Sequence, residues 1–188
     1  MHLTPISLSI LSIATAFLIY QLLSPTTDTN PTNMARILIT GSSDGIGQAA
    51  AKLLIQQGHH VTLHARNAER ANQTSTAVPG AEGVLLGDLS SIASTKSLAE
   101  TANAAGPWDA VVHNAGVGPS ASDRKTGDGL AMTFQVNTLA PFILTSLMER
   151  PKRLLYLSSQ LHSGGDDSLK DVGWKERKFE AFQAYGDT

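Results

Sequence analysis

From residue 35 onward, short apolar runs alternate with longer stretches whose apolar residues recur at helical spacing. Five apolar runs are bounded by Gly, Pro or polar residues, as strands typically are. These runs are Arg36 to Thr40, His60 to His64, Gly83 to Leu86, Ala110 to Val112 and Arg153 to Leu157. Because they are uniformly apolar rather than alternating, we expect strands of a sheet that is buried on both faces.

Four stretches between these strands predict helices, namely Ile46 to Gln57, Asn67 to Thr76, Ser91 to Ala105 and Thr126 to Met148. Gly58 is a natural stop for the first helix, and Pro141 must kink the last one or lie near its first part. Repeated strand–helix units with short connections predict a doubly wound parallel sheet in a three-layer α/β/α arrangement. Residues 160–178 form a long polar loop, which predicts an active-site flap or a poorly ordered segment.

Residues 1–24 differ from the rest of the chain. Leu3 to Leu23 carries no charged side chain, and about 20 apolar-dominated residues can cross a bilayer as a helix. We expect a membrane anchor here, a polar linker over 25–34 and one domain over 35–188. The first basic residues follow the apolar run, which favours a cytosol-facing domain, for example at the endoplasmic reticulum. The alternatives are a targeting peptide, or translation from Met34 and a cytoplasmic protein.

Composition excludes several classes of function. The 188 residues carry a net charge of −2 and show no basic stripe, so nucleic-acid binding is not expected. The absence of cysteine excludes disulfides, thiolate zinc sites and a cysteine nucleophile. His59 and His60 are adjacent, so their side chains diverge and we expect no metal site there.

The octapeptide TGSSDGIG, Thr40 to Gly47, lies between the first strand and the first helix. Its glycines allow a tight turn and close approach of a ligand, and the free N–H groups of the helix start favour an anion. The motif predicts a site for a dinucleotide pyrophosphate, although a tight turn without a ligand would also satisfy it. The expected cofactor-binding residues are Gly41, Ser43, Asp44, Gly45, Ile46 and Gly47.

Later strand ends add further cofactor candidates. Arg66 follows the second strand, with no acid before Glu69, and suits the 2′-phosphate of NADP, so NADP is favoured over NAD; a solvated surface arginine is the alternative. Asp88 and Leu89 follow the third strand and either contact adenine or begin the next helix. After the fourth strand, small residues allow close passage of the cofactor at Asn114, Ala115 and Gly116. We expect His113 to be a wall of the adenine pocket or a satisfied polar group.

Six motifs follow one another along the chain: TGSSDGIG, Asp88, HNAG, FQVNTLAPF, LYLSS and AFQAYGDT. Together they resemble the classical short-chain dehydrogenase/reductase family from about Arg36 to the end. The resemblance implies a Rossmann-type fold, NAD(P)(H), and oxidation of an alcohol or reduction of a carbonyl compound. By position it implies that Ser159 orients the substrate oxygen, that Tyr185 passes a proton and contacts the cofactor, and that Asn137 holds a relay water. Members commonly form homodimers, and the oligomeric state here stays open.

The sequence departs from the family at two points. His113 replaces the first Asn of the usual Asn-Asn-Ala-Gly, which should leave its backbone role intact. The family's Lys, four residues after the Tyr, would fall beyond Thr188. Without an ammonium to favour the phenolate, proton transfer is expected to drop on the order of 10²–10⁴-fold. We therefore expect a fragment of a longer enzyme or a truncated gene product, whose fifth strand is an exposed edge.

Several alternatives stay open at this point. One is a non-catalytic dinucleotide-binding protein, another is a membrane-associated remnant without a ligand, and a third is a hydrolase using Ser159 and His162, which lacks the usual nucleophile elbow. The apolar N-terminal segment suggests a lipophilic substrate. Trp174 and Phe179 either line an apolar pocket or anchor the loop.

Overall fold

The computed structural model describes residues 34–121 and 125–188. The predicted apolar segment 1–24 and nearly all of the linker 25–34 lie outside these residues. Within the described part of the chain, helices of the length and apolar character needed to cross a bilayer are absent.

Five parallel strands form a single sheet in the order β3-β2-β1-β4-β5. The strands are β1 Arg36–Ile39, β2 His60–Ala65, β3 Gly83–Leu86, β4 Ala110–His113 and β5 Arg153–Tyr156. The chain runs outward from β1 to β3, then returns to the other side of β1 for β4 and β5. This confirms the predicted doubly wound sheet and places its topological switch point between β1 and β4.

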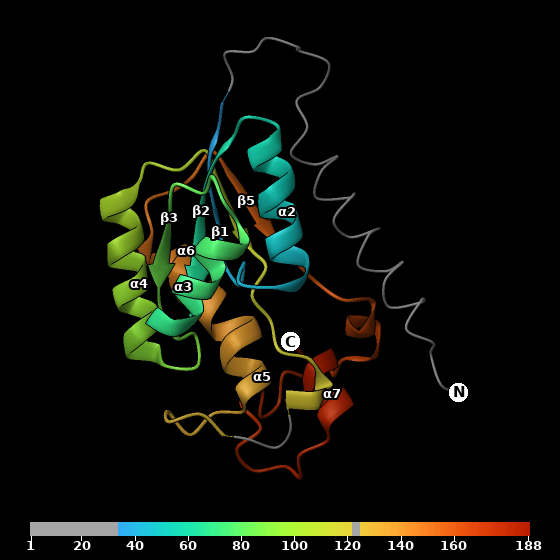
Figure 1. Cartoon of the computed structure of the whole chain (residues 1–188). Helices are drawn as coiled ribbons and strands as arrows, with labels where there is room; N and C mark the ends of the chain where they lie inside the picture. The colour runs from blue at the N-terminus through green and yellow to red at the C-terminus, as the bar shows by residue number, and fades with distance from the viewer. Residues whose placement is uncertain (1–33, 122–124) are drawn as a thin grey trace.

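Helices cover both faces of this sheet, as Figure 1 shows. They are α2 Gly45–Gln56, α3 Ala68–Ala77, α4 Ile92–Ala105 and α6 Ala140–Leu147. Alternate residues of β1 fill two separate cores, because successive side chains of a strand point to opposite faces. Ile37 packs with Leu54 of α2 on one face, whereas Leu38 packs with Leu98 of α4 and Leu144 of α6 on the other.

Burial differs between the central and the edge strands. The side chains of β4 are all buried, as are those of β1 and β2 after their first residues. In contrast, β3 and β5 expose several residues, including Leu86 and Tyr156. The expectation of full burial therefore holds only for the three inner strands, because an edge strand has a neighbour on one side only.

The long helix predicted from Thr126 to Met148 is wrong at its start. Helical structure begins with α5 Met132–Phe134, passes through a π-helical turn, η2 Gln135–Leu139, and continues into α6. The preceding residues form a loop closed by a bridge between Lys125 and Ala131, with Gly129 at φ +78°. Pro141 explains the π-helical turn, since proline cannot donate the backbone bond that regular α geometry requires.

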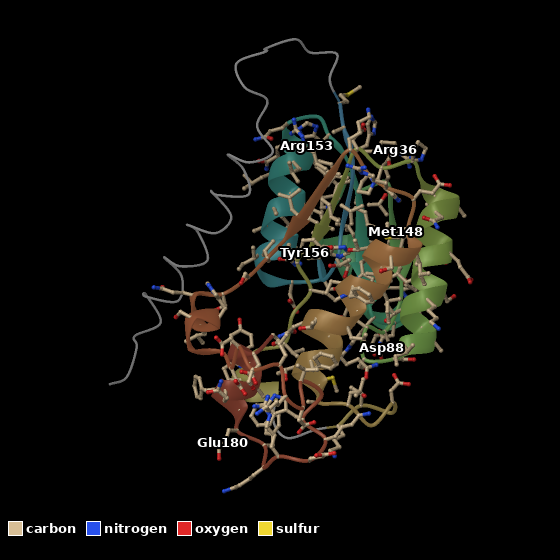
Figure 2. The ribbon with its side chains drawn as sticks, turned by 180° about the vertical axis from the view of Figure 1, so that it is seen from behind. Arg36, Asp88, Met148, Arg153, Tyr156 and Glu180 are labelled. Atoms are coloured by element: carbon tan, nitrogen blue, oxygen red, sulfur yellow. The ribbon has the colours of Figure 1, made fainter. Side chains whose placement is uncertain are left out.

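The remaining short elements lie after the strand ends. They are η1 Pro119–Ala121, η3 Gln160–Gly164 and α7 Ala181–Gly186. In Figure 2, Arg36 and Arg153 mark the strand starts at one end of the sheet, whereas Tyr156 lies toward the opposite end and Glu180, just before α7, lies beyond it. Segments that follow the carboxyl ends of the strands therefore meet at one edge of the molecule.

The polar loop 160–178 is anchored by aromatic packing. Trp174 is 4% exposed and meets Phe179 edge-to-face with ring centroids 5.5 Å apart. Ala131 and Ala184 complete this small core. Of the two roles predicted for Trp174 and Phe179, the structure supports anchoring of the loop.

Candidate functional site

The glycine-rich turn after β1 needs glycine for two different reasons. Gly41 and Gly45 have φ values of +62° and +54°, in the left-handed region that other residues rarely adopt. A β-carbon on Gly41 would lie 2.6 Å from the Cα of Ala115, whereas one on Gly45 would meet no atom within 4 Å. The turn is therefore packed against the segment after β4 on one side and open on the other.

The first turn of α2 presents backbone amides at this open side. Asp44 precedes the helix, but its carboxylate does not cap it. The first intrahelical bond runs from Gln48 N to Asp44 O, at 3.2 Å. The amides of residues 45–47 precede that bond and carry the positive end of the helix dipole. Their arrangement suits a phosphate group.

Asn114 ties this turn to the neighbouring strand. Its Nδ2 donates to the carbonyl oxygens of Thr40 and Gly41, both at 2.9 Å. The Thr40 hydroxyl oxygen in turn accepts from the backbone N–H groups of Asn114 and Ala115, both at 3.1 Å. The two segments at the switch point thus form one hydrogen-bonded unit.

Two arginines lie where β2 leads into α3. Arg66 directly follows β2 and is exposed. Arg70, in the first turn of α3, forms an ion pair with Asp44 of the glycine-rich turn. Arg70 was not among the predicted site residues, although a second arginine in the first turn of the predicted helix, four residues after Arg66, could have indicated it.

Asp88 and Leu89 shape the turn after β3. The exposed carboxylate of Asp88 accepts from Ser90 N at 2.9 Å and from its hydroxyl at 2.6 Å. Leu89 is 6% exposed and belongs to the core. Ser91, not Asp88, caps α4 by accepting from Ser94 N.

A cavity of about 730 Å³ brings the predicted catalytic residues together with cofactor candidates from the start of α2 and the segment after β4. It lies against the start of α2, the segment after β4, the π-helical turn and α7. Its lining includes Ile46, Asn114, Ala115, Gly116, Asn137, Ser159 and Tyr185. Arg66 and Asp88 are not among its lining residues; they lie after β2 and β3, on the other side of the switch point.

Ser159 and His162 do not form a nucleophile–base pair. The Ser159 hydroxyl oxygen accepts from Leu161 N at 3.3 Å and caps η3. The His162 ring nitrogen Nδ1 lies 2.5 Å from the carbonyl oxygen of Ser159, not from its hydroxyl. A hydrolase would need the base at the hydroxyl, so this geometry disfavours that alternative.

The carboxamide of Asn137 is engaged with the backbone. Its Oδ1 accepts from Val117 N at 2.8 Å, and its Nδ2 donates to Val117 O at 3.0 Å and to the Thr188 hydroxyl at 3.1 Å. The residue four positions later is Pro141, which cannot donate an α-helical bond to the Asn137 carbonyl. The side chain thus shapes the cavity wall.

His113 forms a polar cluster with two residues that sequence reasoning missed. Its Nε2 lies 3.1 Å from the Thr145 hydroxyl, which lies 2.5 Å from the Tyr156 hydroxyl. The other ring nitrogen, Nδ1, is buried without a hydrogen-bond partner among the described residues. Burial lowers the pKa of His113 to about 4, so the ring is neutral and one of its two polar atoms is satisfied.

Comparison with known proteins places this geometry in a wider context. Residues 35–151 match the model of the short chain dehydrogenase family. An uncharacterized oxidoreductase of Emericella nidulans, AN7799, is 63% identical over 142 residues, which cover 74% of this chain and 56% of that protein. The chain spans 56–61% of the length of the first three curated relatives it matches.

Two solved structures share the fold. The crystal structure of an uncharacterized protein from Mycobacterium paratuberculosis has a TM-score of 0.72 and 26% identity, covering 81% of this chain and 56% of that one. The Pseudomonas aeruginosa RhlG/NADP active-site complex has a TM-score of 0.60 and 26% identity, covering 83% and 62%.

Proposed function

The chain belongs to the short-chain dehydrogenase family, and on this basis we propose that it is an NADP-dependent oxidoreductase acting on an alcohol or a carbonyl compound. When bound, the nicotinamide nucleotide supplies or accepts hydride. One observation carries the proposal: a single cavity is lined by Ile46 at the start of α2, by Asn114 after β4, and by Ser159 and Tyr185.

The residues of the glycine-rich turn fit the pyrophosphate of such a nucleotide. The amides at the start of α2 would bind its oxygens, and the open space at Gly45 leaves room for it. Asn114, Ala115 and Gly116 would line its path toward the nicotinamide end. Asp88 and the Leu89 amide would contact the adenine.

The preference for NADP rests on the charge at the end of β2. Arg66 would pair with the 2′-phosphate, as an arginine fork does with phosphate oxygens. Arg70 would add a second positive charge and, through its ion pair with Asp44, would reduce the repulsion between that carboxylate and the phosphate. The NADP complex of the structural relative RhlG is consistent with this preference.

The chemical step would use Ser159 and Tyr185. The Ser159 oxygen accepts from Leu161 N, so its hydroxyl hydrogen can be donated to the substrate oxygen and orient it. The Tyr185 hydroxyl would give a proton to that oxygen during reduction or accept it during oxidation. Because the Asn137 carboxamide is engaged with Val117, a relay water would bind the Asn137 backbone carbonyl instead.

For the whole protein we further propose a lipophilic substrate, membrane attachment through residues 3–23 and a cytosol-facing domain over 35–188. The support for these points is the uncharged N-terminal segment of the sequence. Homodimer formation stays a prediction from the family resemblance.

The test of the cofactor assignment is a fluorescence titration of the 188-residue chain with NADPH and with NADH. We expect tighter binding of NADPH. Arg66→Asp should weaken NADPH binding by roughly tenfold or more, because a charge-assisted hydrogen bond contributes about 1.5–3 kcal/mol, and should abolish the preference. Arg70→Ala should have a smaller effect in the same direction. Arg153→Ala, at the opposite end of the sheet, is the matched control.

Different outcomes contradict different parts of the proposal. A folded chain that binds neither coenzyme at millimolar concentration would refute the cofactor assignment. Equal affinity for both coenzymes would refute only the NADP preference. Turnover is tested separately with a panel of ketones and aldehydes, using Tyr185→Phe as the inactive reference; turnover above that reference would contradict the non-catalytic alternative.

A further inference from the structure

His64 lies beside the proposed coenzyme site and was not predicted to have a role there. Its side chain bridges two loops: Nδ1 accepts from Gly41 N at 3.0 Å, and Nε2 donates to the Gly87 carbonyl oxygen at 2.8 Å. We infer that His64 is a positioning residue, which in its neutral form holds the glycine-rich turn in the shape that binds the coenzyme. The inference rests on the proposed function of that turn.

The two contacts require one protonation state. A backbone N–H donates and a carbonyl accepts, so the ring must carry its hydrogen on Nε2 and leave Nδ1 as an acceptor. His64 is 3% exposed, and burial lowers its pKa, while the Gly87 carbonyl and the Asp88 carboxylate act in the opposite direction. A protonated ring would set a second N–H against the N–H of Gly41.

The backbone of the same residue holds the rest of the turn. His64 N donates to the Ser42 hydroxyl, which donates to the Ile39 carbonyl, both at 2.9 Å. The Ser43 hydroxyl donates to the His64 carbonyl at 3.3 Å. Each of the three residues after Thr40 therefore has a hydrogen bond to His64 of β2.

This position couples the two ends of the adenosine site. Gly41 lies between the His64 ring and Ala115, whose Cα leaves no space for a β-carbon on Gly41. Gly87 immediately precedes Asp88, the proposed adenine contact. Loss of the ring would free Gly41 on one side and the Gly87 carbonyl on the other, so the phosphate-binding turn and the adenine loop would no longer be held at a set separation.

Two substitutions separate the contacts. In His64→Asn, the side-chain oxygen can take the place of Nδ1 and keep the bond to Gly41, whereas in His64→Gln the amide nitrogen can take the place of Nε2 and keep the bond to Gly87. We expect the Kd of NADPH to stay within about threefold in the first and to rise about tenfold in the second. His60→Asn, on the same strand but at its far end, is the control and should bind as the wild type does.

The pH dependence supplies a readout that a purely structural role would not change. The Kd of NADPH should rise on acidification in the wild type and rise less in His64→Asn, which cannot be protonated. The 2′-phosphate of NADPH is the same in both experiments, and both proteins keep the other charged groups at this edge, namely Asp44, Arg66, Arg70 and Asp88. The difference between the two profiles therefore reports His64.

Circular dichroism and thermal unfolding establish that each variant is folded. A folded His64→Gln that binds NADPH as tightly as the wild type would overturn the inference and leave the proposed function standing. If His64→Gln does not fold, identical pH profiles for the wild type and His64→Asn would overturn it. A folded wild type that ignores both coenzymes would refute the proposed function and the inference together.

Discussion

The side-chain nitrogen of Asn114 occupies the space that a β-carbon on Gly47 would need, at a distance of 2.3 Å. The same nitrogen donates to the Thr40 and Gly41 carbonyls, so it cannot move aside without losing both bonds. The first turn of α2 and the segment after β4 therefore approach each other only because residue 47 has no side chain.

Gly47→Ala should therefore lower both stability and coenzyme affinity. Overpacking at a fixed contact lowers the free energy of unfolding by about 1–3 kcal/mol. The displaced Asn114 would also disturb the glycine-rich turn. Chemical denaturation measures the first effect and NADPH titration the second. Gly83→Ala, where a β-carbon meets no atom within 4 Å, should change neither; an unchanged Gly47→Ala would contradict the packing argument.

Asn137→Ala should lower the free energy of unfolding by about 1–3 kcal/mol, because the half-buried backbone N–H and C=O of Val117 would both lose their partner. Asn103 offers a matched control, since its side chain also bridges two backbone groups, Leu147 O at 2.9 Å and Glu149 N at 2.8 Å. Asn103→Ala should cost a similar free energy of unfolding. Only Asn137→Ala should also impair NADPH binding or turnover. If Asn103→Ala impairs them equally, Asn137 has no specific role in the site.

The lowered pKa of His113 predicts a pH-dependent stability. Between about 4 in the folded state and 6.5 in the unfolded state, the unfolded chain binds more protons. The free energy of unfolding therefore rises with pH across this window and falls on acidification, by roughly 3 kcal/mol at most.

Denaturation between pH 4 and pH 7 measures this effect. His113→Asn should flatten the dependence, leaving the parts due to His64 and His59, whose pKa values burial also lowers. Hydrogen bonds lower the pKa values of Asp109 and Asp171, but their contribution is common to the wild type and His113→Asn, so the difference between the two slopes reports His113. A slope unchanged in His113→Asn would contradict the assignment.

The ion pair between Arg177 and Asp187 should hold the loop 160–178 against the helix that carries Tyr185. Its atoms lie 2.5 Å apart, and the side chains are 27% and 5% exposed. Arg177→Gln should lower the free energy of unfolding by about 2 kcal/mol, a value between those of surface and buried ion pairs. It should also speed proteolytic cleavage of the loop. The comparison is the pair of Lys152 with Asp109, whose side chains are 82% and 30% exposed. Lys152→Gln should lower the free energy of unfolding by less than about 1 kcal/mol. Equal losses in the two variants would show that the Arg177–Asp187 pair does not hold the loop against α7.

Much of the fold could be predicted because its signals are local. Asn67 and Ser91 cap α3 and α4 through side-chain hydrogen bonds to residues three positions later, and Gly58 ends α2 with φ +88°. The helix that was misplaced, 126–148, depends on non-local effects as well. Its first residues instead form a loop whose Ala131 N donates to Gly173 O, a partner that periodicity cannot reveal.

The candidate site divides in the same way. The glycine spacing and the small residues after β4 predicted the segments that we propose to bind the coenzyme, because backbone conformation and close packing at those positions favour small residues. Arg70, His64 and Tyr156 were missed, since each acts through a partner that is distant in sequence: Asp44, Gly41 and Thr145 respectively.

By itself, the sequence determined the strand–helix alternation, the parallel sheet and the glycine-rich turn after β1, because apolar runs, helix caps and glycines act within a few residues. Only the tertiary structure decided which strands are edges, that the Asn137 side chain bonds the backbone of Val117, and that His64 is the histidine bonded to the glycine-rich turn. Those outcomes depend on strand order and on the close approach of residues far apart in the chain, which are set when the sheet assembles and its polar groups must find partners.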